Sequence, residues 1–509
     1  MMTGQLSIIS LSILSIWFFS SHGKADTVSP WQYQTFKSAT YQPPNMTIEK
    51  HGRTEPGFLF FDQTWAGTVD YAPLIMTDEN ELVWQGPMPA EDNTIFGLRP
   101  QTFEGKPVLT YWRGTGYGDP LGFGYGVIYL LDQSYEEIYR VTLEDSSFAV
   151  VENLTIPSWI DLHESKLTDR GSILVTAVNM TQYDLRSVGG EEDGWIADSL
   201  FYELDVKTSR VLYRWSALEH VDEIPLEGSL LPIDGLGNNR TYAWGAFHIN
   251  SVDFFDDGAY LISSRYYCSI YRINRNGTVD WVLNGRSGGD FKLGPGVDFC
   301  YQHDARIRHT SEDAVIISMF NNANSPVENG TSPSTGLLLR LDLNTHEATL
   351  ERKLLDSRDV IYSESQGNYQ HLPGGHTLLG HGQIPKFKEY DANGSCVMTL
   401  QFGENNEVSS YRGFRLPWIG KPKTPPSVWA CSSGNSTHIY MSWNGATELT
   451  GWNVYGGSNA SHLQLVGSVP KKGFETTIVI GSVRYVQVEG KEGALMSRTS
   501  SVVPVNATC

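Results

Sequence analysis

Histidines recur through this 509-residue chain in a short pattern, in which a histidine is followed by a polar turn and then by a β-rich run. The four histidines of the pattern are His163, His248, His303 and His371, separated by 85, 55 and 68 residues. At neutral pH an imidazole can serve as a nucleophile, a general acid or base, or a metal ligand. The long, roughly regular separation indicates that each histidine belongs to its own structural repeat, so that the four can converge on one site.

The stretch GNYQHLPGGHTLLGHG, residues 367–382, contains three histidines and raises the question of a metal site. A Pro-Gly pair at residues 373–374 suits the centre of a tight turn, so the stretch is predicted to form a β-hairpin. A two-residue turn would set His371 opposite His376, whereas His381 would face the other side of the sheet. We therefore expect no metal site from this segment alone, and any chemistry here needs partners from elsewhere.

The elements that carry the four histidines are predicted to be β-strands. Two copies of the pattern are followed by a strand, an Asn-Gly turn and another strand, and no convincing helical period of ten or more residues is found. Repeated four-stranded units predict an all-β fold, a β-propeller, with a sandwich or a β-helix as alternatives. Divided into six blades, residues 26–425 would give about 67 residues per blade, against ~40–45 in a compact blade, which implies long rim loops.

A glycine-rich run, GTGYGDPLGFGYG at Gly114–Gly126, is predicted to be one of these loops. Glycine-rich loops bind dinucleotides when a helix follows them, but here the strand-like segment VIYLLD follows. The dinucleotide interpretation is therefore not favoured. Its glycines are expected to let the backbone turn tightly near a ligand.

A second, smaller domain follows the proline-rich linker KPKTPP at residues 421–426. Beyond the linker the chain consists of short alternating segments, and with Trp443, Tyr455 and Tyr485 at their places it resembles a fibronectin type III-like β-sandwich. The predicted organisation is a signal peptide at residues 1–25, a propeller at 26–425 and the sandwich at 426–509.

The N-terminus predicts export. Leu6–Phe19 is an apolar core interrupted only by serines, and Gly23 and Ala25 are small residues at positions −3 and −1 of a cleavage site. A signal anchor is the alternative, but the core is short for a membrane span of ~20 residues. No later segment is apolar enough to cross a membrane, so the mature chain is expected to be soluble and secreted. Ten N-x-S/T triplets predict N-glycosylation, at Asn45, Asn153, Asn179, Asn239, Asn276, Asn329, Asn393, Asn435, Asn459 and Asn506.

Charge and cysteine content exclude other classes of protein. The net charge is −20 without a basic run, so nucleic-acid backbones would be repelled. Five cysteines without a CxxC pair do not suggest zinc or thioredoxin chemistry, and no metal is expected. In an oxidising compartment Cys268–Cys300 is the expected disulfide, Cys431–Cys509 is a second candidate, and one cysteine is left over.

Several ordered motifs over roughly residues 30–420 are similar to the arylsulfotransferase-like family, in its secreted, fungal-type branch. They are YWRG, GYGVIYLLDQSY, DLHESKLTDRGSILVT, YDLRSVGGEEDGWIADSLFYELD, HINSVDFFDDGAYLISSR, FCYQHDARI and GNYQHLPGG. The resemblance implies a six-bladed propeller that transfers a sulfuryl group from a phenolic sulfate to another phenol. It also implies a sulfohistidine intermediate and no nucleotide donor or other cofactor.

The resemblance also assigns roles. By chain order His371 is the expected nucleophile and His248 the general acid and base. His303, with Arg265 or Arg306, is expected to hold the sulfuryl oxygens, and His163 to bind substrate. Bacterial members have an arginine after the third histidine, whereas this chain reads SMFNNAN there.

Two other functional classes remain as alternatives. Four propeller histidines could bind a non-haem iron, because four imidazoles on inner strands can hold one metal. The propeller could also be repurposed, either as a tailoring enzyme that acts on a phenolic or polyketide secondary metabolite without sulfate, or as a non-catalytic binding glycoprotein.

Overall fold

The computed structural model describes residues 31–509 except 66, 90–92, 119–121, 147, 149–155, 328–331 and 493–495. The predicted signal peptide and the sequons at Asn153 and Asn329 lie outside this part of the chain. The described residues form strands and four short 3₁₀ helices, with no α-helix among them. Those 3₁₀ helices are η1 (Arg186–Val188), η2 (Leu218–His220), η3 (Leu226–Gly228) and η4 (Arg240–Tyr242).

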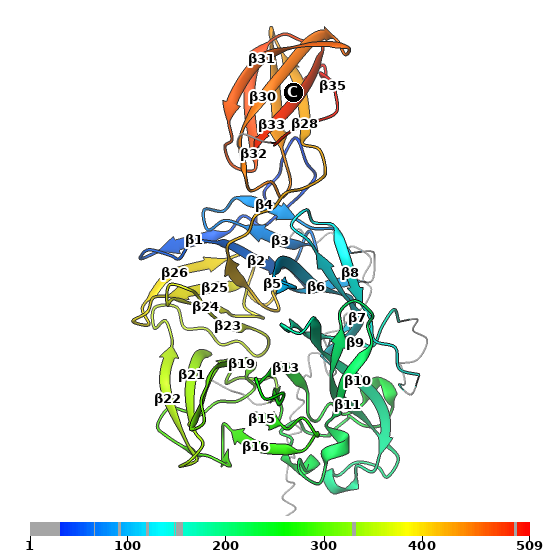
Figure 1. Ribbon diagram of the computed structural model, residues 1–509, viewed down its shortest axis with the longest axis vertical. Helices are drawn as coiled ribbons and strands as arrows, with labels where there is room; N and C mark the ends of the chain where they lie inside the picture. The colour runs from blue at the N-terminus through cyan, green and yellow to red at the C-terminus, as the bar shows by residue number, and fades with distance from the viewer. Residues whose placement is uncertain are drawn as a thin grey trace, which may run out of the picture.

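Six antiparallel blades surround a central axis and confirm the predicted all-β propeller (Figure 1). Blades 1 and 6 lie at the closure of the ring. From the axis outward, blade 1 contains β27 (Phe414–Leu416), β2 (Phe58–Asp62), β3 (Pro73–Met76) and β4 (Leu82–Gln85). Blade 6 contains β23 (Asn368–His371), β24 (Thr377–Gly380), β25 (Lys386–Tyr390), β26 (Cys396–Gln401) and β1 (Thr47–Lys50).

Blades 2 and 3 are joined into one sheet by a single pairing between Gly126 and Ile160. Blade 2 contains β5 (Thr94–Phe103), β6 (Lys106–Tyr117), β7 (Phe123–Leu131) and β8 (Glu137–Val141). Blade 3 contains β9 (Ile160–Leu167), β10 (Ser172–Tyr183), β11 (Gly194–Asp205) and β12 (Val211–Ser216).

Blades 4 and 5 are the remaining two and carry most of the central polar residues. Blade 4 contains β13 (Ile249–Phe254), β14 (Tyr260–Ser264), β15 (Ser269–Ile273), β16 (Val279–Asn284) and β17 (Gly288–Gly289). Blade 5 contains β19 (His303–Thr310), β20 (Ala314–Asn321), β21 (Thr335–Asp342) and β22 (Glu347–Leu354), with the short β18 (Lys292–Leu293) parallel to β22.

Strand patterns and turn residues explain the blades. In β21 buried and less buried positions alternate with the period of two that a strand requires, and its buried leucines enter the core shared with blade 4. Both Asn-Gly turns join strands as predicted, with Gly277 and Gly394 at φ of 96° and 84°. Only glycine adopts such values without strain.

The hairpin at residues 367–382 differs in register from the expectation. His371 pairs with Thr377, and the amide of Leu372 bonds to the carbonyl of His376. The loop is therefore three residues long, and Gly375, at φ 94°, provides the extra residue. His371 and His376 are thus not directly opposite each other.

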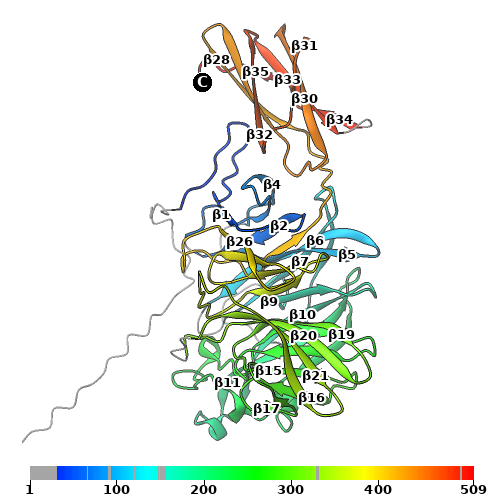
Figure 2. The ribbon, with the colours of Figure 1, turned by 90° about the vertical axis from the view of Figure 1, so that its left-hand side faces the viewer.

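The chain beyond residue 426 folds into a two-sheet sandwich at one end of the molecule (Figure 2). One sheet contains β28 (Ser427–Ser433), β29 (Ser436–Ser442) and β32 (Glu475–Gly481). The other contains β30 (Leu449–Asn459), β31 (His462–Pro470), β33 (Tyr485–Glu492), β34 (Met496–Thr499) and β35 (Val503–Pro504). The side chain of Asn444 bonds to both the amide and the carbonyl of Gln85, at 2.9 and 2.8 Å, and so joins the sandwich to the outer edge of blade 1.

Both candidate disulfides form, Cys268–Cys300 in the propeller and Cys431–Cys509 in the sandwich, and Cys396 is the free cysteine. Asn179 is half-buried within β10, whereas the other described sequon asparagines are exposed. Within the described part of the chain, no helix has the length and apolar character needed to span a bilayer.

Candidate functional site

Three of the four predicted histidines meet at one end of the propeller axis. His163 lies on β9, His248 directly precedes β13 and His303 is the first residue of β19, so each comes from the innermost strand of its own blade. The Nε2 atoms of His163 and His248 are 3.1 Å apart and the two rings are nearly perpendicular. All three side chains are nine-tenths or more buried. The repeat-based prediction of convergence is therefore correct for these three residues.

Asp161 extends the pair into a chain of three groups. Its Oδ2 atom lies 2.5 Å from Nδ1 of His163, and it also accepts hydrogen bonds from the amide of Gly124 and the hydroxyl of Thr176. Burial by itself would raise the pKa of Asp161, but the charge and hydrogen bond of His163 keep it below the usual value. Asp161 is therefore ionised, and Nδ1 of His163 donates to it.

Nδ1 of His248 is the end of this chain that has no hydrogen bond within the described part of the structure. Among the described residues it has no hydrogen-bond partner, and it is not one of the fully buried polar atoms. Burial lowers the pKa of His248 well below its usual value, and the charges of His163 and Arg265 lower it further. His248 is thus a neutral imidazole with one free nitrogen.

Hydrogen bonds on both ring nitrogens fix His303. Its Nδ1 atom lies 2.8 Å from Oδ1 of Asn322 and 3.1 Å from the carbonyl of Tyr301, and since both are acceptors, Nδ1 carries the proton. Nε2 accepts from the amide of Gln366. Asn322 also donates to the carbonyl oxygens of Ser363 and Gln366. Asn322, from the SMFNNAN stretch, therefore fixes the tautomer of His303.

Arg265 supplies positive charge beside the histidines. Its guanidinium donates to the carbonyl of Glu364 at 2.9 Å and to the hydroxyl of Tyr266, and it has no carboxylate partner among the described residues. Its charge lowers the pKa of both His248 and His303. Arg265 fits the predicted role of binding an anionic group.

The Cys268–Cys300 disulfide connects two sides of the site. Cys268 follows the turn that carries Arg265, and Cys300 stands just before the strand that begins with His303. The backbone is strained nearby, since non-glycine residues around the histidines have positive φ: His248, Cys268, Tyr301, Asp304 and Gln366. Such strain persists where the surrounding structure holds the backbone firmly, and it is concentrated at functional sites.

The glycine-rich run has two structural roles, of which the sequence predicted one. Gly122, at φ 63°, approaches the ring of His248 so closely that a Cβ there would lie 3.3 Å from Cε1. Gly114, Gly124 and Gly126 instead lie inside β6 and β7, where a Cβ would come within 2.8 Å of the indole of Trp112. Three of the six glycines in the run therefore pack against a buried tryptophan, and Gly122 borders the site. The run is not the rim loop that the sequence predicted, because its two ends lie within β6 and β7.

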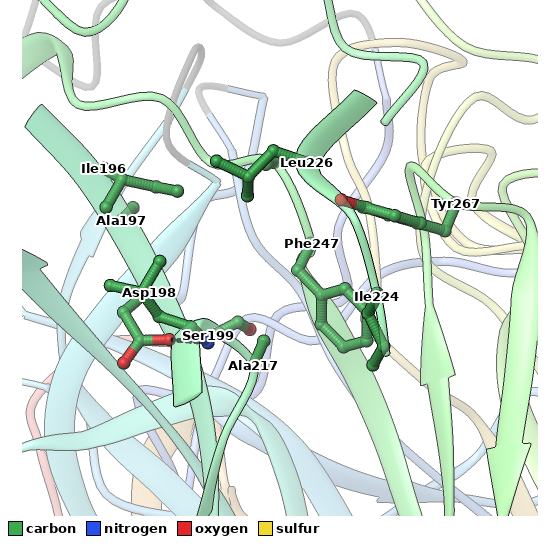
Figure 3. A pocket seen from close by; sticks show the side chains of 11 residues that line it. Ile196, Ala197, Asp198, Ser199, Ala217, Ile224, Leu226, Phe247 and Tyr267 are labelled. Carbon is green, nitrogen blue, oxygen red and sulfur yellow. Dashed lines mark hydrogen bonds between the residues drawn. The ribbon is translucent and has the colours of Figure 1, made fainter. Parts of the chain in front are cut away.

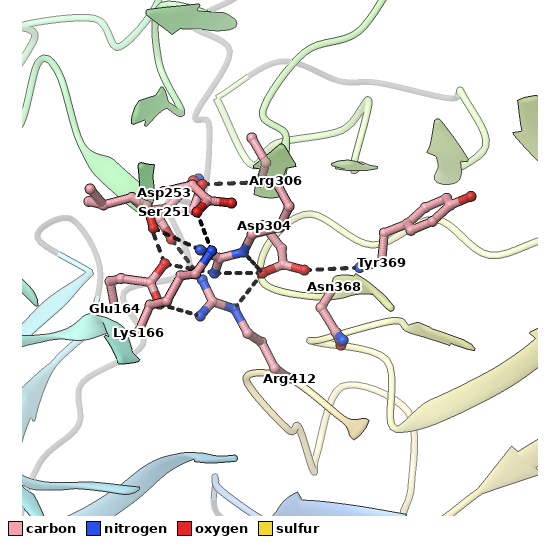
Figure 4. A network of polar contacts seen from close by, with 12 residues as sticks. Glu164, Lys166, Ser251, Asp253, Asp304, Arg306, Asn368, Tyr369 and Arg412 are labelled. Atoms are coloured by element: carbon pink, nitrogen blue, oxygen red, sulfur yellow. Dashed lines mark hydrogen bonds and ion pairs between the residues drawn. The ribbon is translucent and has the colours of Figure 1, made fainter. Parts of the chain in front are cut away.

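Arg306 does not have the predicted role. Its guanidinium contacts Oε2 of Glu164 at 2.7 Å and Oδ1 of Asp304 at 2.8 Å, within a buried network of ion pairs (Figure 4). Arg412 and Arg99 bind Glu164 from the other side, at 3.2 and 3.3 Å. Since two carboxylates already neutralise Arg306, it is not available to hold sulfuryl oxygens.

His371 also lies outside the cluster. It is the last residue of β23 and its side chain is exposed. The groups whose charges affect its pKa are Arg308, Arg352 and Glu55, and none of the three clustered histidines is among them. The histidine cluster lies near the first residues of the inner strands, whereas His371 lies at the end of its strand. The assignment of His371 as nucleophile therefore does not fit the geometry.

The other two histidines of the hairpin are separate as well. His376 is 2.8 Å from Glu389, and His381 is buried beside Phe320 with neither ring nitrogen hydrogen-bonded. Among the described residues, no group of three His, Cys, Asp or Glu side chains is arranged to hold a metal.

Two cavities lie away from the histidines. One, of about 20 Å³, is roughly the size of a water molecule and lies between blades 3 and 4 beside Asp198, Phe247 and Tyr267 (Figure 3). The other, of about 590 Å³, lies between the propeller and the sandwich, and Trp84 and Lys423 are among the residues that line it.

Comparison with solved structures finds remote likenesses. A protein of unknown function from Bacteroides caccae is 12% identical, with a TM-score of 0.39, covering 71% of this chain and 100% of that one. Virginiamycin B lyase from Staphylococcus aureus is 10% identical, with a TM-score of 0.32, covering 77% of this chain and 94% of that one. No curated protein sequence matches the chain.

A sequence family does match. The sequence model of the family described as Arylsulfotransferase (ASST) matches residues 99–403, from β5 in blade 2 to just beyond β26 in blade 6. This segment contains the three clustered histidines, Asp161 and Arg265. With more than half of its length matched, the chain belongs to the arylsulfotransferase (ASST) family.

Proposed function

We propose that this protein transfers a sulfuryl group from a phenolic sulfate to another phenol, without a nucleotide donor and through a sulfohistidine. The observation that carries the proposal is the buried chain from Asp161 through His163 to His248, beside the unneutralised cation Arg265. A nucleophilic imidazole and a cation for the oxygens of the transferring group are what this chemistry requires.

The nucleophile in this proposal is Nδ1 of His248. Its lone pair attacks the sulfur of the aryl sulfate, a nitrogen–sulfur bond forms, and the sulfur–oxygen bond breaks with its electron pair on the departing phenolate. The imidazole ring then carries a positive charge. Nε2 of His248 donates to Nε2 of His163, whose Nδ1 donates to Asp161, so the carboxylate stabilises that charge through the intervening ring.

The second half of the reaction reverses the first. An acceptor phenol attacks the sulfur of the sulfohistidine, and the nitrogen–sulfur bond breaks with its electron pair on Nδ1. The phenolic proton passes to solvent, where it balances the phenolate released in the first half. Arg265 offsets the negative charge on the sulfuryl oxygens in both halves. His303, fixed by Asn322, positions the wall of the site and carries no proton to the substrate.

Intact-mass analysis tests the proposal directly. The protein is incubated with an aryl sulfate that has a good leaving group, and the expected result is an increase in mass by one sulfuryl group, which an added phenol removes. A panel of aryl sulfates that yields neither an adduct nor transfer would contradict the proposal.

A second candidate function is proton transfer to a phenolic substrate without sulfate. The observation in its favour is that Arg306 is neutralised and Asn322 lies beside His303, which leaves Arg265 as the one cation without a carboxylate at the histidines among the described residues. In that case His163 and His248 act as an acid–base pair. Phenolic turnover without any mass adduct would favour this candidate.

The proposal also covers the cellular location and the domain organisation of the protein. We infer export into the secretory pathway, glycosylation, a fungal-type branch and a fibronectin type III-like sandwich beyond residue 425. The two disulfides and the exposed position of most described sequon asparagines support export.

A further inference from the structure

The inner strands carry a second set of charged residues, at the end of the axis opposite the histidines. Lys166, Asp253 and Arg308 follow the histidines along β9, β13 and β19. Along these strands, Glu164 and Asp304 of the ion network drawn in Figure 4 come after the histidines and before Lys166 and Arg308. This second set takes no part in the chemistry proposed above.

The central cluster contains more positive than negative charge. Five cations accompany three carboxylates, an excess of two positive charges: the cations are Arg99, Lys166, Arg306, Arg308 and Arg412, and the carboxylates are Glu164, Asp253 and Asp304. The whole chain, by contrast, has a net charge of −20. Uncompensated charge in a buried or partly buried site is costly unless an ion of opposite sign accompanies it.

The carboxylates near this end are already occupied. Asp253 binds Lys166 and accepts from the amides of Phe254 and Ile307. Glu55, whose charge reaches His371, accepts from the amides of Gly374 and His376 in the hairpin. Asp253 is therefore already counted against Lys166. Glu55 keeps its negative charge, and when it is included five cations face four carboxylates, an excess of one positive charge.

Arg308 is held in place without a carboxylate partner among the described residues. Its Nε donates to Oγ of Ser318 and its Nη2 to the carbonyl of Tyr369, both at 2.6 Å. Nη1 has no hydrogen bond within the described part of the chain, and the side chain is exposed. The guanidinium is thus fixed in orientation and open to solvent, which is the arrangement that favours recognition of an oxyanion.

We propose that this end of the axis is an anion-binding site, in which Arg308 holds a small oxyanion such as inorganic sulfate, with His371 at the rim. The site is separate from the histidine cluster and does not depend on sulfuryl transfer. Arg308 supplies the oriented guanidinium donors, whereas the ammonium of Lys166 is already paired with Asp253 and is not one of the groups that hold the ion.

Titration with sodium sulfate at constant ionic strength tests the site. Calorimetry of the full chain is expected to show two separable binding events, one that Arg265→Gln removes and one that Arg308→Gln weakens by at least about tenfold, as expected for loss of a charge-assisted contact. Arg308→Lys, which keeps the charge but loses the planar donor pair, should give an intermediate affinity. Sodium acetate in place of sulfate shows whether a carboxylate is accepted equally well.

Arg352→Gln is the matched control, because Arg352 is another arginine whose charge reaches His371, and it is half-buried and bonds to the carbonyl of Ala392. It should leave both events unchanged. The proposal is overturned if wild-type protein shows no event besides the one removed by Arg265→Gln, or if Arg308→Gln and Arg308→Lys bind sulfate as wild type does. If Arg308→Gln does not fold, the sulfate affinity of Arg308→Lys alone tests the proposal. A protein without aryl sulfate turnover would still show this event, so the two proposals fail independently.

Discussion

Nε2 of His163 lies 3.1 Å from Nε2 of His248, so the two imidazoles share one proton between these atoms. With Asp161 ionised, Nδ1 of His163 is already protonated. The shared proton therefore lies either on Nε2 of His248, in which case both rings are neutral, or on Nε2 of His163, in which case His163 is a cation. In the neutral pair Nδ1 of His248 has a free lone pair, and this is the state that reacts in the proposed mechanism.

Replacing His248 is expected to abolish the adduct. His248→Asn should lower kcat by at least about 10³-fold, because the residual protein retains binding but has no nucleophile. His371→Asn is the matched control and should leave adduct formation and kcat unchanged, since His371 is exposed at the far end of β23. Intact-mass analysis measures the adduct in each variant, and initial rates measure kcat. An adduct in His248→Asn that is lost in His371→Asn would restore the assignment of His371.

Replacing Asp161 should slow the reaction without removing the nucleophile. Asp161→Asn keeps the shape of the side chain but no longer stabilises positive charge on the two imidazoles. We expect kcat to fall by ~10²–10⁴-fold while KM changes little. The adduct should still form, more slowly, in single-turnover mass measurements. A variant with wild-type kcat would show that the carboxylate serves only the fold.

The two disulfides should differ in their effect on activity. Cys268→Ser with Cys300→Ser is expected to cost about 2–4 kcal/mol of stability and also to lower kcat/KM, because that bridge joins the segments that carry Arg265 and His303. Cys431→Ser with Cys509→Ser, in the sandwich, should cost stability alone. Denaturant unfolding and initial rates, measured together, separate the two effects. Equal kinetics in both double variants would contradict this role of the first bridge.

Asp198 should make stability depend on pH. Burial raises its pKa from 3.8 to about 6, because the carboxyl lies beside a small cavity with few compensating contacts. The protonated form is favoured in the folded state, so its contribution is fully present below about pH 4 and is lost as pH rises through about 6. Asp198→Asn should therefore have a higher Tm than wild type at pH 8, with the difference shrinking toward pH 4. If the Tm of Asp198→Asn differed from that of wild type by the same amount at every pH, the raised pKa of Asp198 would be contradicted.

Glycosylation should be visible on gels. Endoglycosidase treatment of protein expressed through a secretory pathway is expected to increase its mobility. Asn276→Gln removes an exposed acceptor in the turn between β15 and β16 and should remove one step of the shift. Asn274→Gln in the same turn is the control, since Asn274 begins no sequon. No change in mobility for the wild type would contradict secretion and glycosylation together.

The fold could be predicted from local patterns because each blade is specified locally. Alternating strands, Asn-Gly turns and the repeated histidine indicate a blade without reference to the rest of the ring. The hairpin register at His371 was predicted one residue off, because the additional loop residue, Gly375, depends on the backbone geometry of the turn and the Pro-Gly pair alone does not reveal it.

The site could be predicted only in part. The spacing of His163, His248 and His303 identified the cluster, but roles depended on which end of a strand each histidine occupies. Asp161 was missed, although its position two residues before His163 on a strand sets both side chains on one face. Arg306 was misassigned because one of its two carboxylate partners, Glu164, comes from blade 3, and no pattern within one segment shows that pairing. The other partner, Asp304, lies two residues before Arg306 on the same strand and could have been noticed.

The innermost strand of blade 1 comes from the far end of the propeller sequence. β27 (Phe414–Leu416) pairs with β2 (Phe58–Asp62), and Arg412, two residues before β27, completes the central ion network. A chain emerging from the ribosome therefore contains all three clustered histidines well before its ring can close. Until the last blade strand is synthesised, Glu164 and Asp304 lack one of their arginines, so the central ion network can be completed only after the rest of the propeller sequence has been made.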